Sequence, residues 1–406
     1  MSANLAELIE GIASLQVYNS VYAVPPELVA KIVDELEHDR ASLKACSFVA
    51  TPFRGPSQRH LLRSIWIHRE NWKYYSNRQK GLHKGTTVPS GTIKSFSSLL
   101  SESPYLAGYI RDLTIDLPDS ADEDIPLAGV LQSAPNLERF VISGLSTRWT
   151  DLSPALASTI LDVFMRPSLS ILHLLDIQGI PESEVMRALS AMNIFSLHTT
   201  TFDPEPHTDS IHRPVSNAKH LLLGTNHSST YEALLSRRAP KFGNVKRLFL
   251  TLNGNRHFDE ALMSVANTLT CLELDCGRLN TSFQLPTLPH LCTLILHISQ
   301  DLTRRIPEGL ARTLRGLQLV SLTMIFAIQN RIVEEPWADE GPLIDLDARL
   351  IEETHCKLLF LDPTTRPPVR DSAYASFCQA LRAALPGFLT EFSRIENEHS
   401  YISRLP

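Results

Sequence analysis

The sequence predicts an α/β fold, in which a short N-terminal helical module is followed by a long solenoid of parallel strands that alternate with helices. Two observations predict it. Residues 24–67 carry helix-start residues and apolar residues at helical spacing, and a short apolar pattern then recurs along most of the 406-residue chain. Strand-like and helix-like segments that alternate indicate a parallel sheet. We therefore expect an extension at 1–20, a helical module at 21–60, and a solenoid with a closing helix at 61–406.

The first helix of the module should begin at Pro25 and Pro26. Proline at the first helical position loses no needed N–H, and Glu27 complements the positive end of the helix. Leu28 and Ile32 follow at a spacing of four, as Leu36 does after them. This spacing predicts an amphipathic helix with one broad apolar face.

A second helix should follow, with Asp39 or Ser42 as its N-terminal cap. Its apolar residues include Leu43 and Val49, and Pro52 should end it. Two or three short helices cannot bury a core by themselves. We therefore expect this module to pack on a neighbour or to bind a partner.

The module resembles an F-box, in the divergent form found in large families of mushroom-forming fungi. The residues that carry the resemblance are Pro25, Pro26, Glu27, Leu28, Ile32, Leu36, Leu43, Ala45, Cys46, Ser47, Val49, Phe53, Arg54 and the segment 59–65. In that family, the corresponding helices bind the Skp-type adaptor of a cullin ubiquitin ligase. The resemblance implies that Pro26, Leu28, Ile32, Leu36, Leu43 and Val49 contact such an adaptor. The alternative is that these helices only cap the end of the solenoid.

After the module, three apolar residues recur in the order apolar, two variable, apolar, one variable, apolar. The members are Leu62/Ile65/Ile67, Ile110/Leu113/Ile115, Leu137/Phe140/Ile142, Leu169/Leu172/Leu174, a weak Ile194/Leu197/Thr199, Ala218/Leu221/Leu223, Val245/Leu248/Leu250, Leu269/Leu272/Leu274 and Leu291/Leu294/Leu296. From Ile142 onward, the last apolar residues of successive repeats are about 22 to 32 residues apart. This spacing brackets the period of irregular leucine-rich repeats. We expect strands on the concave face and helices on the convex face.

Helix-like segments with apolar residues at three or four spacing separate these strands. They cover 96–106, 155–165, 183–192, 230–238, 259–267 and 307–314. Beyond Leu296 two registers are admissible, Leu314/Leu317/Leu319 and Leu319/Leu322/Met324. Further on, we expect a helix at 343–353, a strand at 357–361 and a closing helix at 373–385.

The residue between the last two apolar positions of each strand should face the concave surface. With their neighbours, these positions give a candidate target-binding set of Thr114, His173, His198, His220, Arg247, Phe249 and Glu273. Because adjacent strands lie about 4.8 Å apart, His173 and His198 should stack. Ordinary surface histidines are the alternative.

Three loops are distinctive. Residues 71–91 are basic and aromatic, a composition that can bind nucleic acid but is more often a solvated loop. Residues 116–124 are expected to form an exposed acidic turn, and 204–214 a loop rich in proline and histidine. The net charge of −6 disfavours nucleic acid and anionic membranes as partners.

The sequence carries no signature of catalysis or of cofactor binding. It has no GxxxxGK[ST], GxGxxG after a strand, HExxH or GxSxG motif, and its six cysteines form no CxxC pair. His207 and His212 have poor spacing for a metal. We therefore expect no enzyme, cofactor or metal.

These observations and the resemblance together predict the substrate-recognition subunit of a Skp/cullin/F-box ubiquitin ligase. It would bind an unknown target protein and be a monomer outside its complex. No apolar run approaches the roughly 20 residues of a membrane span, and the N-terminus lacks the basic start of a signal peptide. We therefore expect a cytoplasmic or nuclear location. The alternative function is a protein-interaction scaffold outside any ligase.

Overall fold

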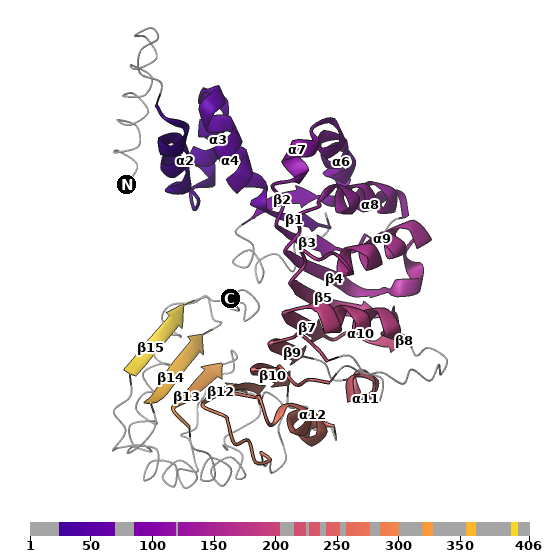
Figure 1. The fold of residues 1–406 in the computed structure, drawn as a ribbon, viewed down its shortest axis with the longest axis vertical. Coiled ribbons are helices and arrows are strands. Elements are labelled where there is room, and N and C mark those ends of the chain that lie inside the picture. Colours follow the sequence, from indigo (N-terminus) through magenta and orange to yellow (C-terminus); the bar gives the residue numbers. More distant parts are fainter. Residues whose placement is uncertain are drawn as a thin grey trace, which may run out of the picture. The chain divides into compact units, whose positions relative to one another are not determined.

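The structure, a computed structural model, is shown in Figure 1. It describes residues 24–69, 85–118, 121–203, 215–224, 227–235, 241–251, 257–276, 285–299, 319–327, 355–362 and 391–396. The chain forms two compact units, Met1–Arg63 and Ser64–Pro406, and each is described by itself. No helix among these residues is long and apolar enough to cross a bilayer.

The first unit contains three consecutive helices, α2 (Pro26–Asp34), α3 (Arg40–Val49) and α4 (Thr51–Arg63). The predicted proline start of α2 is confirmed. Asp39 caps α3, because its carboxylate accepts hydrogen bonds from the Ser42 N–H at 3.1 Å and the Ser42 hydroxyl at 2.6 Å. As predicted, α3 ends before Pro52. The sequence pattern did not indicate α4, since two prolines and a glycine interrupt it.

These helices bury a small core of their own. Val29 and Val33 of α2, Leu43 of α3 and Phe53 of α4 form it, and Ile32, Leu36, Cys46, Ala50 and Leu61 pack against it. Every member comes from the first unit. The module therefore has a local core, which the length of its helices alone did not predict.

The second unit is built on a 13-stranded sheet in which every described pair of strands is parallel. The strands are β1 (Ser64–His68), β2 (Thr86–Pro89), β3 (Asp112–Asp116), β4 (Arg139–Arg148), β5 (Ile171–Gln178), β7 (Ile194–His198), β9 (His220–Gly224), β10 (Arg247–Thr251), β11 (Cys271–Asp275), β12 (Thr293–Ser299), β13 (Ser321–Ala327), β14 (His355–Asp362) and β15 (Glu391–Glu396). Chain order is kept across the sheet from β3 to β15, while β1 lies between β2 and β3. A second, two-stranded sheet pairs β6 (Ile180–Pro181) with β8 (Phe202–Asp203).

Helices connect many of these strands and lie along one face of the sheet (Figure 1). They are α6 (Ile93–Glu102), α7 (Pro104–Ala107), α8 (Asp124–Ser133), α9 (Pro154–Phe164), α10 (Glu182–Ala191), α11 (Ser228–Leu235) and α12 (Phe258–Val265), with short 3-10 turns at Ser90–Thr92, Ala121–Glu123 and Trp149–Asp151. The expected helices near 155–165, 183–192, 230–238 and 259–267 are confirmed within a few residues, and that at 96–106 is divided between α6 and α7. The sequence analysis missed α8. The expected helices at 307–314, 343–353 and 373–385 lie outside the described residues.

A repeating hydrogen-bond pattern joins the strand starts from β3 to β13. The carbonyl of Arg111 accepts hydrogen bonds from the N–H groups of Glu138 and Arg139, at 2.8 and 2.9 Å. The same paired arrangement recurs at the carbonyls of Glu138, Ser170, Asn193, Lys219, Lys246, Thr270 and Cys292. The fold is thus a helical N-terminal unit followed by a long parallel sheet alternating with helices, an α/β arrangement with which a leucine-rich-repeat-like solenoid is consistent.

The strand register confirms most of the predicted pattern and corrects one repeat. Phe195 and Leu197 pair with Leu172 and Leu174, so these two residues occupy the repeat positions of β7. The predicted Ile194/Leu197/Thr199 assignment is wrong, because a phenylalanine fills the expected leucine position. After β12, Leu322 pairs with Leu294, which selects the Leu319/Leu322/Met324 register.

Other sequence expectations need correction at the strand ends. The end of the expected 71–91 loop is strand β2, and β15 was not predicted at all. Asp116 and Asp124 are buried, so the segment 116–124 is not simply an exposed acidic turn. The Asp124 carboxylate accepts the Ser153 N–H at 2.7 Å, and this bond explains its burial. The strand expected at 357–361 is confirmed as β14.

Candidate functional site

The first candidate site lies on the sheet face opposite the helices, which we call the strand face. Along β10, Leu248 and Leu250 are buried, whereas Arg247, Phe249 and Thr251 are partly exposed. Successive side chains of a strand point to opposite faces, so these three belong to the strand face. Residues that pair with these three in the parallel register of the neighbouring strands lie on the strand face as well.

Three of the predicted target-binding residues, Thr114, His173 and Glu273, are buried on this face. His173 is only 1% exposed, and its neighbours in register are Val141 and Ser196. Burial, with the nearby charge of Arg139, lowers the pKa of His173 to about 3. Its imidazole is therefore neutral at physiological pH.

The predicted stacking of His173 on His198 is wrong. Because β7 is shifted from the expected register, Ser196 occupies the position beside His173, and His198 pairs with Leu175 and Gly224. His198 is exposed and lies over Gly224, where a Cβ would come within 2.4 Å of its Cδ2 atom. Although the residue is exposed overall, the protein atoms packed around its ring displace water and lower the pKa of His198, while the charges of Asp176 and Asp275 oppose that effect.

Further along the strand face, three charged or titratable side chains meet. The Arg247 Nη2 group donates to Glu273 Oε2 at 2.7 Å, and His297 Nε2 lies 2.9 Å from Glu273 Oε1. The rings of Phe249 and His297 contact at 6.3 Å between centroids. We call Arg247, Phe249, Glu273 and His297 the strand-face cluster. His297 was missed from the sequence, although it follows Ile295 by two residues on the same face.

The charge of the strand-face cluster follows from the environment of Glu273, which is 4% exposed. Burial acts to raise the pKa of its carboxyl, but hydrogen bonds from His297 and Arg247 and their charges outweigh it, and the net pKa is lowered. Glu273 is thus a carboxylate that holds both neighbours in place. The arrangement is a buried ion pair rather than a free base.

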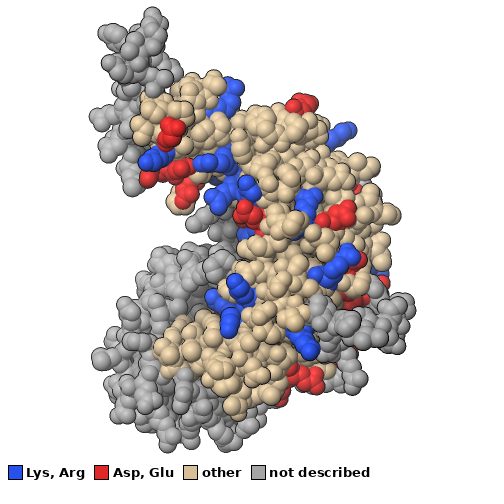
Figure 2. All heavy atoms as spheres, in the orientation of Figure 1, with Lys and Arg blue, Asp and Glu red and all other residues tan. Residues whose placement is uncertain are grey.

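Basic side chains lie next to this cluster at the starts of β9 and β10. Arg247 pairs with His220 across the strands, and the Lys246 N–H donates to the Lys219 carbonyl at 2.8 Å. Both lysines are exposed. Burial and the charges of Arg247 and Lys219 lower the pKa of His220. Figure 2 shows Lys and Arg atoms gathered over the part of the sheet labelled β9 and β10 in Figure 1.

Within the described part of the chain, no group of three His, Cys, Asp or Glu side chains is placed to hold a metal ion. Cys276 is buried, and burial raises the pKa of its thiol to about 12, with a further contribution from Asp275. A thiol with this pKa is a poor nucleophile at neutral pH.

The second candidate site is the exposed apolar surface of the helical module, which we call the module surface. Leu28 is 50% exposed, Val49 is 49% exposed and Phe48 is 85% exposed. Val24 and Pro26, which shortly precede Leu28, are also exposed. Phe48 was not among the predicted adaptor contacts, although it precedes Val49 on the same helix. Large apolar side chains with this exposure mark a surface suited to binding a partner.

The other predicted adaptor contacts lie deeper in the module. Leu43 is 1% exposed and belongs to its core, while Ile32 and Leu36 are half-buried and pack against that core. A direct contact by Leu43 would need the module to open. In this structure, Pro26, Leu28 and Val49 present the accessible part of the predicted set, and Phe48 adds to it.

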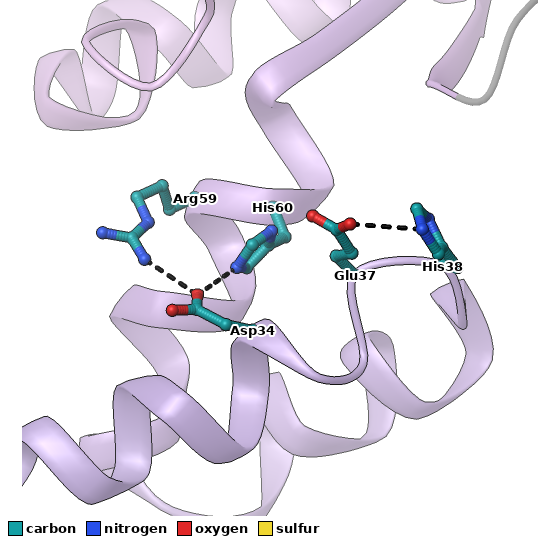
Figure 3. A network of polar contacts seen from close by, with 5 residues as sticks. All are labelled: Asp34, Glu37, His38, Arg59 and His60. Carbon is teal, nitrogen blue, oxygen red and sulfur yellow. Dashed lines mark hydrogen bonds and ion pairs between the residues drawn. The ribbon is translucent and has the colours of Figure 1, made fainter.

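A polar network fixes α2 against α4 in the same module (Figure 3). The Asp34 Oδ1 atom accepts from Arg59 Nη2 at 3.1 Å and lies 2.7 Å from His60 Nε2. Nearby, His38 Nε2 and Glu37 Oε1 are 3.2 Å apart. The network therefore holds the end of α2, the helix that carries Leu28, in a defined position.

Comparison with known proteins adds no family assignment to this geometry. Neither models of known protein families nor curated proteins gave a match to the chain.

Proposed function

We propose that the chain is an F-box-like leucine-rich-repeat protein that serves as the substrate-recognition subunit of a Skp/cullin/F-box ubiquitin ligase. The observation that carries this proposal is the module surface: Leu28, Phe48 and Val49 stay exposed on a helical unit whose core is already filled. The resemblance of residues 25–65 to an F-box gives the partner its identity, a Skp-type adaptor.

The energetics favour the module surface as a docking site. Fully burying a leucine or phenylalanine side chain that water now reaches is worth roughly 1.5–3 kcal/mol. A few such side chains commonly dominate the affinity of a protein interface. Leu28 and Phe48 are the expected anchors, the exposed Pro26 and Val49 add to them, and Leu43 lies in the core below together with the half-buried Ile32 and Leu36.

The strand face is proposed to bind the target protein. Parallel repeat sheets offer broad surfaces that suit protein partners, and the strand-face cluster supplies charged and aromatic groups there. In this function the chain is a receptor without catalytic residues, cofactor or metal, and ubiquitin transfer belongs to its partners. It is a monomer outside the complex, acting in the cytoplasm or nucleus.

A second candidate function is a protein-interaction scaffold in which the helical module only caps the repeats. The ordered polar network of Asp34, Arg59 and His60 favours a module with a structural role of its own, and it is compatible with this alternative. Adaptor binding separates the two functions, because a pure cap has no affinity for the adaptor.

The test is a titration of purified Skp-type adaptor into the full chain, followed by calorimetry. The variant is Leu28→Asp with Phe48→Asp, and the matched control is Ile125→Asp with Met263→Asp, two exposed apolar residues on helices of the second unit. Circular dichroism checks that each protein is folded. We expect a loss of at least a hundredfold in affinity for the module variant and less than threefold for the control.

Two results would overturn the ligase function. The folded parent chain could fail to bind any Skp-type adaptor, which would leave the scaffold function. Alternatively, both double variants could bind equally well, in which case the module surface is not the docking site.

A further inference from the structure

The starts of β9 and β10 carry a cluster of positive charge that the adaptor contact does not use. Lys219 and Lys246 precede the two strands, and His220 and Arg247 are the first residues of the strands. Both lysines are exposed, and their backbones are joined by the hydrogen bond between the Lys246 N–H and the Lys219 carbonyl. The starts of these two neighbouring strands therefore carry three cationic side chains, Lys219, Lys246 and Arg247, with His220 beside them.

Acidic side chains balance this cluster only in part. Glu273 pairs with Arg247, but its other oxygen is engaged with His297. Asp275 lies at the opposite end of β11, four residues from Cys271, which is the register partner of Arg247. Four residues of strand extend about 13 Å, farther than the screening length of about 8 Å at physiological salt. Within the part of the chain that the structure describes, neither lysine has an acidic side chain as an ion-pair partner.

The guanidinium of Arg247 is held in a fixed orientation. Glu273 is buried and accepts from Nη2, and His297 holds the second carboxylate oxygen of Glu273. A preorganised guanidinium loses less entropy when it donates to an incoming carboxylate. The Arg247 side chain is 28% exposed, although its Nε atom is buried.

An apolar side chain lies immediately beside these charges. Phe249 follows Arg247 by two residues on the same face, is partly exposed, and its ring rests against His297. Peptide segments that combine acidic and apolar residues match such a surface, because an aromatic ring adds contact area while the cations set specificity and association rate.

We propose that Lys219, Lys246, Arg247 and Phe249 form a docking site for an acidic segment of the target polypeptide, one in which aspartate or glutamate side chains flank an apolar residue. This inference rests on the proposed function, since it names the class of target that the receptor holds. Lys219 and Lys246 attract the carboxylates, Arg247 orients one of them, and Phe249 contacts the apolar residue.

The test uses the full chain and a fluorescein-labelled twelve-residue peptide with glutamates around a central leucine, followed by anisotropy. A peptide with glutamines in place of the glutamates is the uncharged comparison. The variant is Lys219→Glu with Lys246→Glu, and the control is Lys31→Glu with Lys44→Glu, which changes the net charge equally at exposed lysines of the helical module. Phe249→Ala tests the apolar contact.

We expect the acidic peptide to bind the parent chain at least tenfold more tightly than the glutamine peptide and to weaken as salt rises. Lys219→Glu with Lys246→Glu should lower its affinity at least tenfold, the control less than twofold, and Phe249→Ala about three- to tenfold. Equal loss in both charge variants would overturn the site, because it would show non-specific attraction. Absence of binding by the folded parent, in a preparation that still binds the adaptor, would overturn this inference and leave the proposed function intact.

Discussion

Asp34 and His60 join the first and last helices of the module through a contact of 2.7 Å between Asp34 Oδ1 and His60 Nε2. The hydrogen bond from His60, with the charges of Arg59 and His60, holds the pKa of Asp34 below its usual value against the opposing effect of burial. A carboxyl whose pKa is lowered on folding stabilises the fold above its unfolded pKa. That stability is lost as the pH falls through the lower, folded pKa.

From this contact we predict that Asp34→Asn and His60→Ala each weaken the module at pH 7. Because Asp34 is half exposed, the effect should be small, about 0.5–1 kcal/mol. Hydrogen exchange of the peptides covering 24–63 in the full chain measures it. At a pH below the folded pKa of Asp34, parent and Asp34→Asn should have equal protection. An equal difference at both pH values would show that the carboxylate charge is not involved.

The second prediction compares two phenylalanines of the same module. Phe53 is buried in the core, and Phe48 is 85% exposed. Phe53→Ala removes core contacts and should cost about 3 kcal/mol, whereas Phe48→Ala should change stability by less than about 0.5 kcal/mol. Hydrogen exchange of 24–63 reports both changes in the full chain. Equal effects of the two variants would contradict the assignment of Phe53 to the core and Phe48 to the module surface.

The third prediction concerns the buried carboxylate of the strand-face cluster. Glu273→Gln leaves Arg247 without its charge partner, which should destabilise the second unit by about 3 kcal/mol. The control is Asp112→Asn, because the ion pair of Asp112 with Arg139 at 3.1 Å is partly exposed and should be worth at most about 1 kcal/mol. Urea unfolding followed by circular dichroism compares the two. A larger loss in the control would show that Glu273 does not anchor the cluster.

Much of the fold followed from the sequence, because buried leucines repeat at the positions that pair in the sheet. Where another residue fills such a position, the pattern failed. Phe195 replaces the expected leucine of β7, and the assignment moved by two residues, which put His198 in place of Ser196. The short strand β2 has a single buried side chain, Val88, and β15 follows no recognised repeat.

The candidate sites were predicted less completely, because a pattern along the sequence does not show how deeply each side chain is buried. Leu28 and Leu43 both lie at apolar positions of short helices, yet one is half exposed and the other is in the core. The exposure of Phe48 depends on how three helices pack, and α4 was not recognised. Similarly, Glu273 was predicted as a surface residue, but its burial depends on Arg247 and His297 on the neighbouring strands.

The last prediction concerns Asp116, a buried carboxyl at the end of β3. Burial raises its pKa to about 7, although the backbone and charge of Arg69 and a hydrogen bond from Trp66 oppose the shift. A carboxyl whose pKa is raised on folding does not reduce the free energy of unfolding below its unfolded pKa, near 4. It reduces the free energy of unfolding as the pH rises from there toward 7. Above that pH the penalty stays constant.

Asp116→Asn removes this titration while keeping a side chain of similar size. Relative to the parent, the variant should gain stability between pH 4 and pH 8, by at most about 4 kcal/mol. Urea unfolding at both pH values measures the gain, and Asp151→Asn, at an exposed carboxyl, is the control for the substitution itself. The prediction would be contradicted if variant and parent differed in unfolding free energy by the same amount at pH 4 and at pH 8. Asp116 would then titrate alike in the folded and the unfolded chain, and burying its carboxylate would carry no cost.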